Sequence, residues 1–427
     1  MGAGVLPRTM VDGEAEFSDE SSDDGDPVDG DGAVRGGQRT PLLAPPRLRT
    51  EDDRAATRLE LFFDLAYVLI IHQLAVALKE DLGWDGVLVF AGLFAVTWWS
   101  WVTTTLYANR FDTNDVVYRV LKLAATFAVA VMAASASTAV GGDGTVAFGV
   151  GYIATRLILA GLYLRAWRHI ADARVTINLY FAATVISAVV WGVSLFTSSP
   201  TTYILWAVGI GIEALAPLAA TRWGPNVPLH LEHLPERFGL FVILVLGESI
   251  SAIVLGMHDT HWAWSSLSVA ALGFTIAAAV WWMYFDIGGA EAKTEIQDDE
   301  HAIGSGRADG YVYGHLPLTL GAALLGVGIE QYVLHPIGEM SPAGRWVLCG
   351  GLVLFIAGVC AILGWSSSNW RTVFPWPALA IPVVLIVGFI DTALPFASAV
   401  VLAVGSIVAV VTGIIRRRRS PVATTET

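Results

Sequence analysis

The chain has 427 residues, of which 55% are apolar and only 15% are charged, and its mean hydropathy is +0.60. Soluble proteins carry roughly 25% charged residues, so this composition excludes an ordinary soluble domain. The formal net charge of −13 arises mainly in residues 1–34, where ten acidic residues and one basic residue give −9. The acidity therefore belongs to the N-terminal segment and not to the chain as a whole.

Residues 1–53 form the first predicted segment, an acidic tail. Its centre, Asp12–Gly32, is rich in carboxylates and glycine and holds few apolar side chains. Such a segment buries too little apolar surface to offset the entropy lost on ordering, so we expect a disordered, solvating tail rather than a partner-binding one. The first residues lack the basic-then-apolar order of a signal peptide, and we expect insertion to begin with the first apolar span.

Apolar runs long enough to cross a bilayer follow the tail. A hydrocarbon core about 30 Å thick requires about 20 mostly apolar residues per helix. The sequence therefore predicts an all-α, polytopic membrane helix bundle. Its spans are expected at residues 59–79, 86–107, 119–140, 145–165, 177–197, 201–220, 238–257, 265–287, 311–334, 345–364, 375–391 and 393–415, which makes about twelve transmembrane helices.

The basic residues predict the orientation of these spans. Nineteen Lys and Arg residues of residues 47–419 flank the spans on the side of the N-terminus, and two, Lys79 and Arg345, lie on the other side. The positive-inside rule then places both termini in the cytoplasm of a multi-pass plasma-membrane protein. The run Arg416–Arg419 is typical of a lipid-headgroup anchor, and we expect the lipid bilayer, not nucleic acid, as its partner.

Short matches between the two halves suggest an internal duplication. Arg58 opens the first span and Arg237 the seventh, while Trp98 and Trp281 each begin a Trp-Trp pair late in the following span. Six spans per half would give two parallel repeats related by an axis along the membrane normal. The expected organisation is a tail (1–53), a first membrane half (54–230), a second half (231–416) and a basic C-terminal tail (417–427).

The first span holds the most informative polar residues. Glu60, Asp64 and Tyr67 are spaced i, i+4, i+7 and share one helical face, and His72 lies two turns beyond Asp64. Carboxylate, hydroxyl and imidazole groups along one stripe are the parts of a proton relay or a cation site. The alternative is structural pairing with Arg58 or a neighbouring helix. We favour that alternative for Glu60, leave Asp64 open and favour a functional role for His72.

Further ionisable residues lie inside later spans. Glu248 is near mid-span in the segment Leu246–Ser251, where Gly247 would allow a close helix approach, and its expected partner is Arg156 of the fourth span. A structural pair and an ion site are equally compatible with this pattern.

Two more candidates precede prolines. Glu213 is followed by Pro217 and His315 by Pro317, positions at which a helix can break and expose carbonyl groups.

The sequence lacks the motifs of known soluble-enzyme chemistry. It contains no CxxC, HExxH, Walker A or dinucleotide-binding glycine motif, so we expect no cofactor and no metal site. Cys349 and Cys360 lie eleven residues apart in one predicted helix, too far apart for a disulfide.

Three segments carry a family resemblance: Ala56–Ala75 (ATRLELFFDLAYVLIIHQLA), Glu236–Ile250 (ERFGLFVILVLGESI) and Trp281–Asp286 (WWMYFD). In them the chain resembles the bacterial low-temperature-requirement A family, over about residues 50–415. The resemblance implies a membrane protein linked to growth in the cold, and it implies no particular chemistry. The stretch Arg58–Asp64 is also similar to the RxxxFSD signature of the endosomal potassium/proton channels. It departs from that signature at Phe63, and the second half lacks the aspartate.

These observations favour a transporter or channel for a proton or small cation over an enzyme. Asp64, His72 and Glu248 are the leading translocation candidates, and either Asp64→Asn or Glu248→Gln is expected to stop flux. The rival hypotheses are a membrane enzyme acting on a lipid or isoprenoid substrate, and a sensor or accessory protein without turnover. The sequence does not indicate an oligomeric state.

Overall fold

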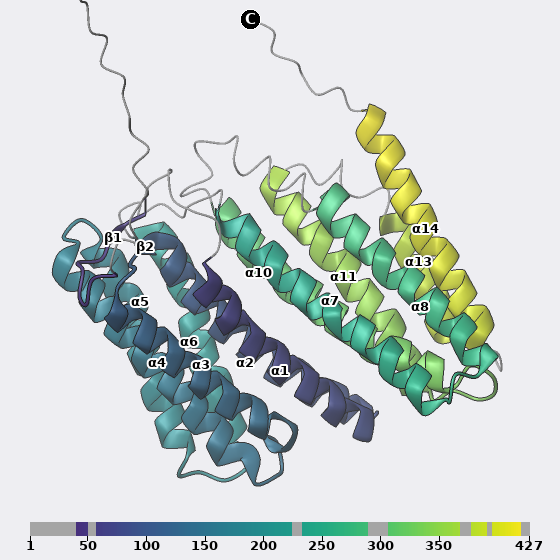
Figure 1. Ribbon diagram of the computed structural model, residues 1–427, viewed down its shortest axis with the longest axis horizontal. Helices are drawn as coiled ribbons and strands as arrows, with labels where there is room; N and C mark the ends of the chain where they lie inside the picture. Colours follow the sequence, from purple (N-terminus) through teal and green to yellow (C-terminus); the bar gives the residue numbers. More distant parts are fainter. Residues whose placement is uncertain are drawn as a thin grey trace, which may run out of the picture. The chain divides into compact units, whose positions relative to one another are not determined.

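Helices account for nearly all of the chain that the computed structural model describes, which is residues 40–49, 57–223, 233–288, 306–367, 377–390 and 395–419. Within these ranges the only sheet pairs the two-residue strands β1 (Arg47–Leu48) and β2 (Phe111–Asp112), so the prediction of an all-α fold is confirmed. These helices and strands belong to one compact unit, Pro41–Thr427 (Figure 1).

The helices follow the predicted spans closely. The first half contains α1 (Arg58–Glu80), α2 (Trp84–Arg110), α3 (Val116–Ser135) with the 3₁₀ turn η1 (Ala136–Thr138), α4 (Gly144–His169), α5 (Arg174–Ser194) and α6 (Thr201–Trp223). The second half contains α7 (His233–Asp259), α8 (Trp264–Trp282) with the π-helical turn η2 (Met283–Gly288), α10 (Arg307–Leu334), α11 (Pro342–Ser367), α13 (Pro377–Phe389) and α14 (Pro395–Arg419).

Eleven of the described helices are long and apolar enough to cross a membrane, which confirms a multi-pass membrane protein. The remaining predicted span, 375–391, corresponds to α13, whose 13 residues are below the length required. At 1.5 Å per residue α13 extends about 20 Å, against a hydrocarbon core of about 30 Å.

The two halves share a pattern of neighbouring helices. In the first half α1 packs on α2 and α3, α3 on α4, α4 on α5 and α5 on α6. In the second half α7 packs on α8 and α10, α10 on α11, α11 on α13 and α13 on α14. This order is what two six-helix repeats require, and their superposition about the membrane normal remains a prediction.

The residues that suggested the duplication nevertheless occupy different environments. Arg58 is exposed, whereas Arg237 is 2% exposed. Trp98 is 1% exposed, whereas Trp281 is 43% exposed. Matching sequence positions therefore do not imply matching polar sites, and each half must be described from its own contacts.

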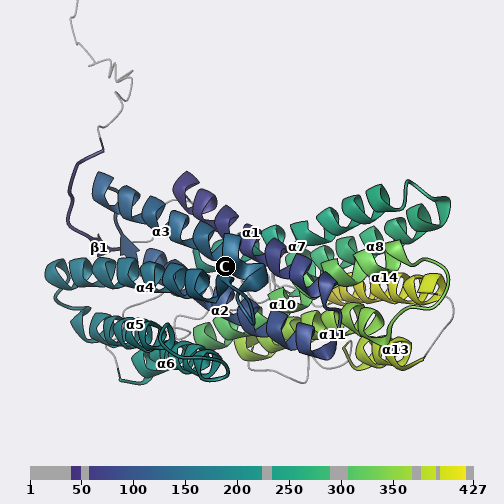
Figure 2. The same ribbon diagram turned by 90° about the horizontal axis from the view of Figure 1, so that it is seen from below.

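The halves meet along α1 and α2, both of which contact α7 and α10. Figure 2 shows α1 between α3 of the first half and α7 of the second. One continuous apolar core runs through this junction, because buried side chains of α1, α2, α7 and α10 belong to the same cluster. Polar groups at the junction are consequently surrounded by apolar side chains.

Part of the predicted tail packs against the bundle. β1 pairs antiparallel with β2, and Arg47 forms an ion pair with Asp112 at 2.9 Å. Asp115, the N-cap of α3, accepts the backbone N–H groups of Ala44 and Tyr118, each at 2.7 Å, and also pairs with Arg165. Of the expected tail, residues 1–39 and 50–53 lie outside the described residues, as do residues 420–427 of the C-terminal tail.

Candidate functional site

Helix α1 directs three polar side chains toward the second half of the protein. Asp64 pairs with Arg237 of α7, His72 with Glu248 of α7, and Lys79 with Glu330 of α10. The three positions on α1 are about 12 Å and about 10 Å apart along the helix axis. We call this row of three pairs the α1 seam. Charged groups inside a bilayer are costly, and pairing at three depths is the expected compensation.

The first pair of the seam, Asp64–Arg237, is buried. Asp64 Oδ1 accepts hydrogen bonds from Nη2 of Arg237 and Nε1 of Trp101, both at 2.8 Å. Asp64 is 0% exposed, and Trp101 stacks on Phe241 of α7 with ring centroids 4.2 Å apart. Since a guanidinium group does not lose its proton in a protein, this pair carries a permanent cation.

From the sequence, Arg237 was placed at the cytoplasmic flank where the seventh span opens, and so was missed as the partner of Asp64. α7 begins at His233, which puts Arg237 one turn inside the helix. Lys122 of α3 was missed in the same way: it is 3% exposed, with Nζ 3.7 Å from the centroid of the Phe63 ring. The available signal was the position of each cation beside a long apolar run.

Glu60 has a structural role at the start of α1. Its Oε2 accepts the backbone N–H of Thr57 at 2.9 Å, while the Thr57 hydroxyl accepts the N–H of Glu60 at 3.3 Å. This reciprocal capping box satisfies two N–H groups that the first helical turn leaves without partners. The expected structural role of Glu60 therefore comes from its own helix end and not from an ion pair with Arg58.

The second pair of the seam differs from the first in chemistry and in access. Nδ1 of His72 lies 3.1 Å from Oε2 and 3.3 Å from Oε1 of Glu248. The His72 side chain is 33% exposed and that of Glu248 is 5% exposed. With Nδ1–H donating to the carboxylate, Nε2 can gain or lose a proton without breaking the contact. The pair can therefore change its charge while keeping its geometry.

A glycine does allow a helix to approach Glu248 closely, but it is not Gly247, the glycine that the sequence suggested. Gly247 faces open space, so it creates no close helix approach. The close approach occurs at Gly326 of α10, where a Cβ atom would lie 3.1 Å from the backbone of Glu248 and of Ser249. α10 therefore supports the segment of α7 that carries Glu248.

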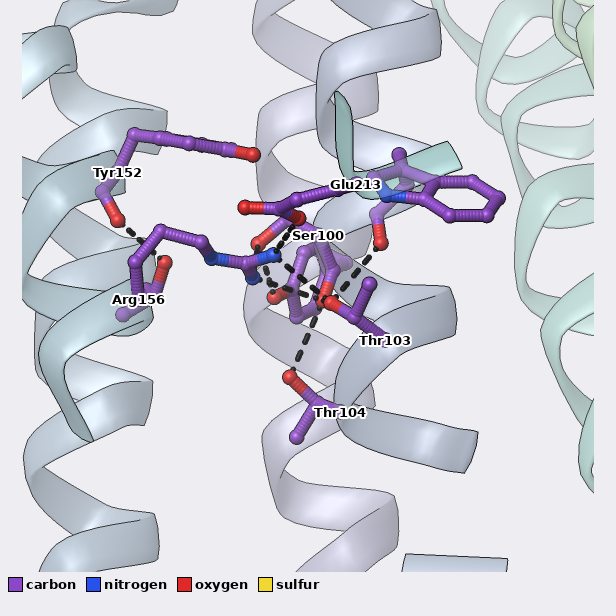
Figure 3. Close-up of polar contacts among 9 residues, drawn as sticks. Ser100, Thr103, Thr104, Tyr152, Arg156 and Glu213 are labelled. Carbon is purple, nitrogen blue, oxygen red and sulfur yellow. Dashed lines mark hydrogen bonds and ion pairs between the residues drawn. The ribbon is translucent and has the colours of Figure 1, made fainter. Parts of the chain in front are cut away.

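Arg156 pairs with Glu213 of α6 and not with Glu248, so the predicted Arg156–Glu248 pair is wrong. The Arg156 Nη1 atom lies 2.7 Å from Glu213 Oε2 and 2.8 Å from Thr103 Oγ1, and Nη2 lies 2.8 Å from Ser100 Oγ (Figure 3). The reason is topological, since α4 packs on α3 and α5 and lies away from α7.

The Arg156–Glu213 network connects to the stripe on α1 through one hydroxyl. Tyr67, which is 0% exposed, lies with its hydroxyl 3.0 Å from Ser100 Oγ. Glu213 Oε1 and Arg156 Nε are buried without a hydrogen-bond partner among the described residues. α6 continues through Pro217 without the expected break. Glu213 is thus the counter-charge of a buried arginine inside the first half.

His315 lies apart from the seam, in contact with η2. Its Nδ1 lies 2.7 Å from the carbonyl oxygen of Tyr311 and its Nε2 lies 2.9 Å from the hydroxyl of Tyr284. A carbonyl only accepts, so Nδ1 carries the hydrogen and Nε2 can accept from Tyr284. His315 is 0% exposed, and α10 runs unbroken through Pro317. Both nitrogens of the neutral ring are satisfied here.

The remaining pairs lie nearer the helix ends. Lys79 Nζ lies 3.0 Å from both carboxylate oxygens of Glu330. His258 and Asp259, at the end of α7, form a contact of 3.1 Å with 81% and 57% of their side chains exposed. Across the part of the chain that the structure describes, no three His, Cys, Asp or Glu residues are grouped closely enough to hold a metal ion.

Comparison with known proteins agrees with this architecture. The model of the bacterial low temperature requirement A protein family matches residues 55–413. An uncharacterized protein of Rhizobium meliloti, RA0937, is 29% identical over 330 residues, which cover 73% of this chain and 78% of that protein. The family match includes ten of the eleven long apolar helices in full, most of the last one, and every residue of the α1 seam. The chain therefore belongs to the bacterial low temperature requirement A family.

Proposed function

We propose that this membrane protein translocates protons or small cations across the plasma membrane, and that His72 and Glu248 form its proton-binding pair. The observation that supports this most is the contact of 3.1 Å between Nδ1 of His72 and Oε2 of Glu248, deep in α1 and α7. Imidazole is the side chain whose ordinary pKa places its charge change near physiological pH. The His72 side chain is 33% exposed, and in this proposal water must reach its Nε2 atom.

The other candidates take supporting roles in this proposal. Asp64 is neutralised by Arg237, and Glu213 by Arg156, and neither cation can release a proton in the membrane. Glu60 is a capping residue, Tyr67 connects α1 to Ser100, and His315 is a fully bonded core residue. Among the candidates from the sequence, this leaves His72 and Glu248 as the pair that we propose to change its protonation.

The position of the pair also favours translocation. It lies on the seam between the halves, with Asp64–Arg237 about 12 Å away toward the start of α1 and Lys79–Glu330 about 10 Å away toward its end. The pair therefore lies at the middle of three depths at which polar groups interrupt an otherwise apolar junction. The excess of basic residues supports the orientation in which the start of α1 and both termini face the cytoplasm.

Proton flux in liposomes tests the proposal. The purified full chain is reconstituted with an entrapped pH-sensitive dye, a potassium gradient is set with valinomycin, and the initial rate is normalised to folded protein. His72→Gln and Glu248→Gln preserve size and hydrogen bonding but remove the titration. Each is expected to lower the rate at least about tenfold, an effect of about 1.4 kcal/mol on the barrier.

A control pair is present at the end of α7. His258 and Asp259 form an exposed imidazole–carboxylate pair, and His258→Gln and Asp259→Asn should leave flux unchanged. Wild-type flux in both His72→Gln and Glu248→Gln would overturn the proposal. Absence of flux from wild-type vesicles would also overturn it, and would favour the rival enzyme or sensor hypotheses.

A further inference from the structure

A cavity of about 730 Å³ lies where α1 begins, away from the His72–Glu248 pair. Its walls come from the first residues of α1 and α3, the end of α2, and β2. Three arginines line it: Arg49, Arg58 and Arg119. None of the three forms an ion pair with any residue in the described ranges. The cavity is therefore rich in cations whose charge is not neutralised within the described structure.

The carboxylates that line the cavity already have partners. Glu60 accepts the N–H of Thr57 at 2.9 Å in the capping box. Asp112 accepts two hydrogen bonds from Arg47, at 3.0 and 2.9 Å. Because Arg47 is paired with Asp112, the three arginines face one further carboxylate, that of Glu60, and the lining keeps a net positive charge that favours an anionic ligand.

Arg49 has buried hydrogen-bond donors that require an acceptor. Its Nε and Nη1 atoms are buried and have no hydrogen-bond partner among the described residues, and the same holds for Thr113 Oγ1. The backbone of Arg49 is fixed in place, because its N–H donates to the carbonyl of Arg110 at 3.1 Å. A guanidinium group presents a planar set of donors that matches two oxygens of a phosphate.

One side of the cavity is apolar and faces outward. Phe62 and Leu123 line it and are 53% and 47% exposed. The same apolar exposure continues along α1 at Leu65, 50% exposed, and along α3 at Phe127, 72% exposed. In a membrane protein, such a surface contacts acyl chains. A ligand that fills the cavity and covers this surface carries both a phosphate and lipid tails.

We propose that this cavity binds the phosphate of an anionic phospholipid, with Arg49 and Arg119 holding the phosphate oxygens and the acyl chains lying along Phe62 and Leu123. A soluble phosphate compound shares the headgroup chemistry, but it would leave the exposed apolar side chains uncovered. Basic pockets between transmembrane helices are established binding sites for lipid headgroups. The site is independent of the proposed transport function.

Binding to the purified full chain in detergent tests the site, with acyl-labelled fluorescent phosphatidic acid as the probe. Labelled phosphatidylcholine tests the need for net negative charge, and labelled diacylglycerol tests the need for phosphate. Phosphatidic acid is expected to bind saturably and at least about tenfold more tightly than the other two. Binding should weaken as salt is added, because mobile ions screen the arginines.

Two variants localise the site. Arg49→Gln removes the buried donors, and Arg119→Gln removes an exposed cation whose loss leaves the core intact. Each is expected to weaken phosphatidic acid binding about fivefold. The matched control is Arg168→Gln, an exposed arginine at the end of α4 and outside the cavity, which should bind like the wild type.

Three results would overturn the proposal. Equal affinity for phosphatidic acid and phosphatidylcholine would show that the cavity does not recognise an anionic headgroup. Unchanged binding in both Arg49→Gln and Arg119→Gln would place the lipid elsewhere. Displacement of the lipid by glycerol phosphate at equal concentration would assign the cavity to a soluble phosphate compound.

Discussion

The two polar pairs that α1 makes with α7 show how similar positions acquire different properties. Asp64–Arg237 and His72–Glu248 have the same short contact, 2.8 and 3.1 Å, and lie on the same two helices. Asp64 is fully buried beneath Trp101 and faces a cation that keeps its proton, whereas His72 is 33% exposed. In the function proposed above, the first pair therefore holds the two halves together and the second exchanges a proton.

The difference comes from residue type and access rather than from depth. A buried pair with a permanent cation is strongly destabilised when one partner is removed, because the other charge remains in an apolar environment. An imidazole, unlike a guanidinium group, can lose its proton, so a His–Glu pair tolerates loss of the carboxylate charge. Comparing substitutions in the two pairs therefore separates a structural role from a functional one.

The largest loss of stability is expected for Arg237→Gln. This change leaves the Asp64 carboxylate with Trp101 as its hydrogen-bond donor and should lower the free energy of unfolding by about 3–5 kcal/mol. Thermal unfolding followed by size-exclusion chromatography of detergent extracts measures the loss. The double variant Asp64→Asn/Arg237→Gln removes both charges and should recover much of it. A double variant no more stable than Arg237→Gln would contradict the assignment of this pair as a charge-compensated contact.

A smaller loss of stability is expected for Gly326→Ala, at the position where α10 supports the His72–Glu248 pair. Gly326→Ala places a Cβ atom 3.1 Å from the backbone of Glu248, which cannot move aside as a flexible side chain can. We expect a loss of about 1–3 kcal/mol in the free energy of unfolding. Gly247→Ala, one residue before Glu248 and facing open space, is the control and should be neutral or stabilising. Equal stability of the two variants would show that α10 does not position Glu248.

The smallest loss of stability concerns Asp115, which lies just before the span of α3 and pairs with Arg165 of α4. Burial alone would raise the pKa of Asp115, but the hydrogen bonds from Arg165, Tyr118 and Ala44 outweigh it and hold the pKa below its ordinary value of 3.8. The stabilisation is therefore complete above the ordinary pKa, and it is lost as pH falls through the lower value in the folded state. Protease resistance of residues 40–49 should therefore stay constant from roughly pH 5 to 8.

Substitution at this pair checks the same contact. Asp115→Ala removes the hydrogen bonds to Ala44 and Arg165 and should speed cleavage within residues 40–49 about fivefold, as expected for a loss of about 1 kcal/mol. The control is Asp112→Asn, since its partner Arg47 is 73% exposed and such surface pairs contribute little. Equal cleavage of both variants and the wild type would show that Asp115 does not hold this segment.

The sequence predicted the helices well because apolar length is a local property. It also predicted that Asp64, His72 and Glu248 lie inside spans and need partners. It assigned Arg156 to Glu248 because the two share a depth, but partners are decided by which helices are neighbours. Arg237 was counted as a flanking cation because the apolar run begins after it, although α7 begins at His233.

The glycines near Glu248 also show that a local sequence pattern does not identify which residues meet in the fold. Gly247 stands beside Glu248 in the sequence, and yet the glycine that approaches Glu248 is Gly326, almost eighty residues away on α10. Likewise, nothing local in the sequence connects Arg49 to Arg119, which the cavity at the start of α1 brings together. Contacts between distant helices depend on tertiary packing, and the pattern of one chain does not encode them locally.

The measurement that tests the central distinction most directly compares proton flux per folded protein in vesicles for two variants. One is Glu248→Gln, and the other is Asp64→Asn/Arg237→Gln. Glu248→Gln should abolish flux with a near-normal yield of folded protein, while the double variant should retain flux in whatever fraction folds. Two results would contradict the division of the α1 seam into a holding pair and a proton-exchanging pair. One is flux retained in Glu248→Gln, and the other is flux lost in the folded fraction of the double variant.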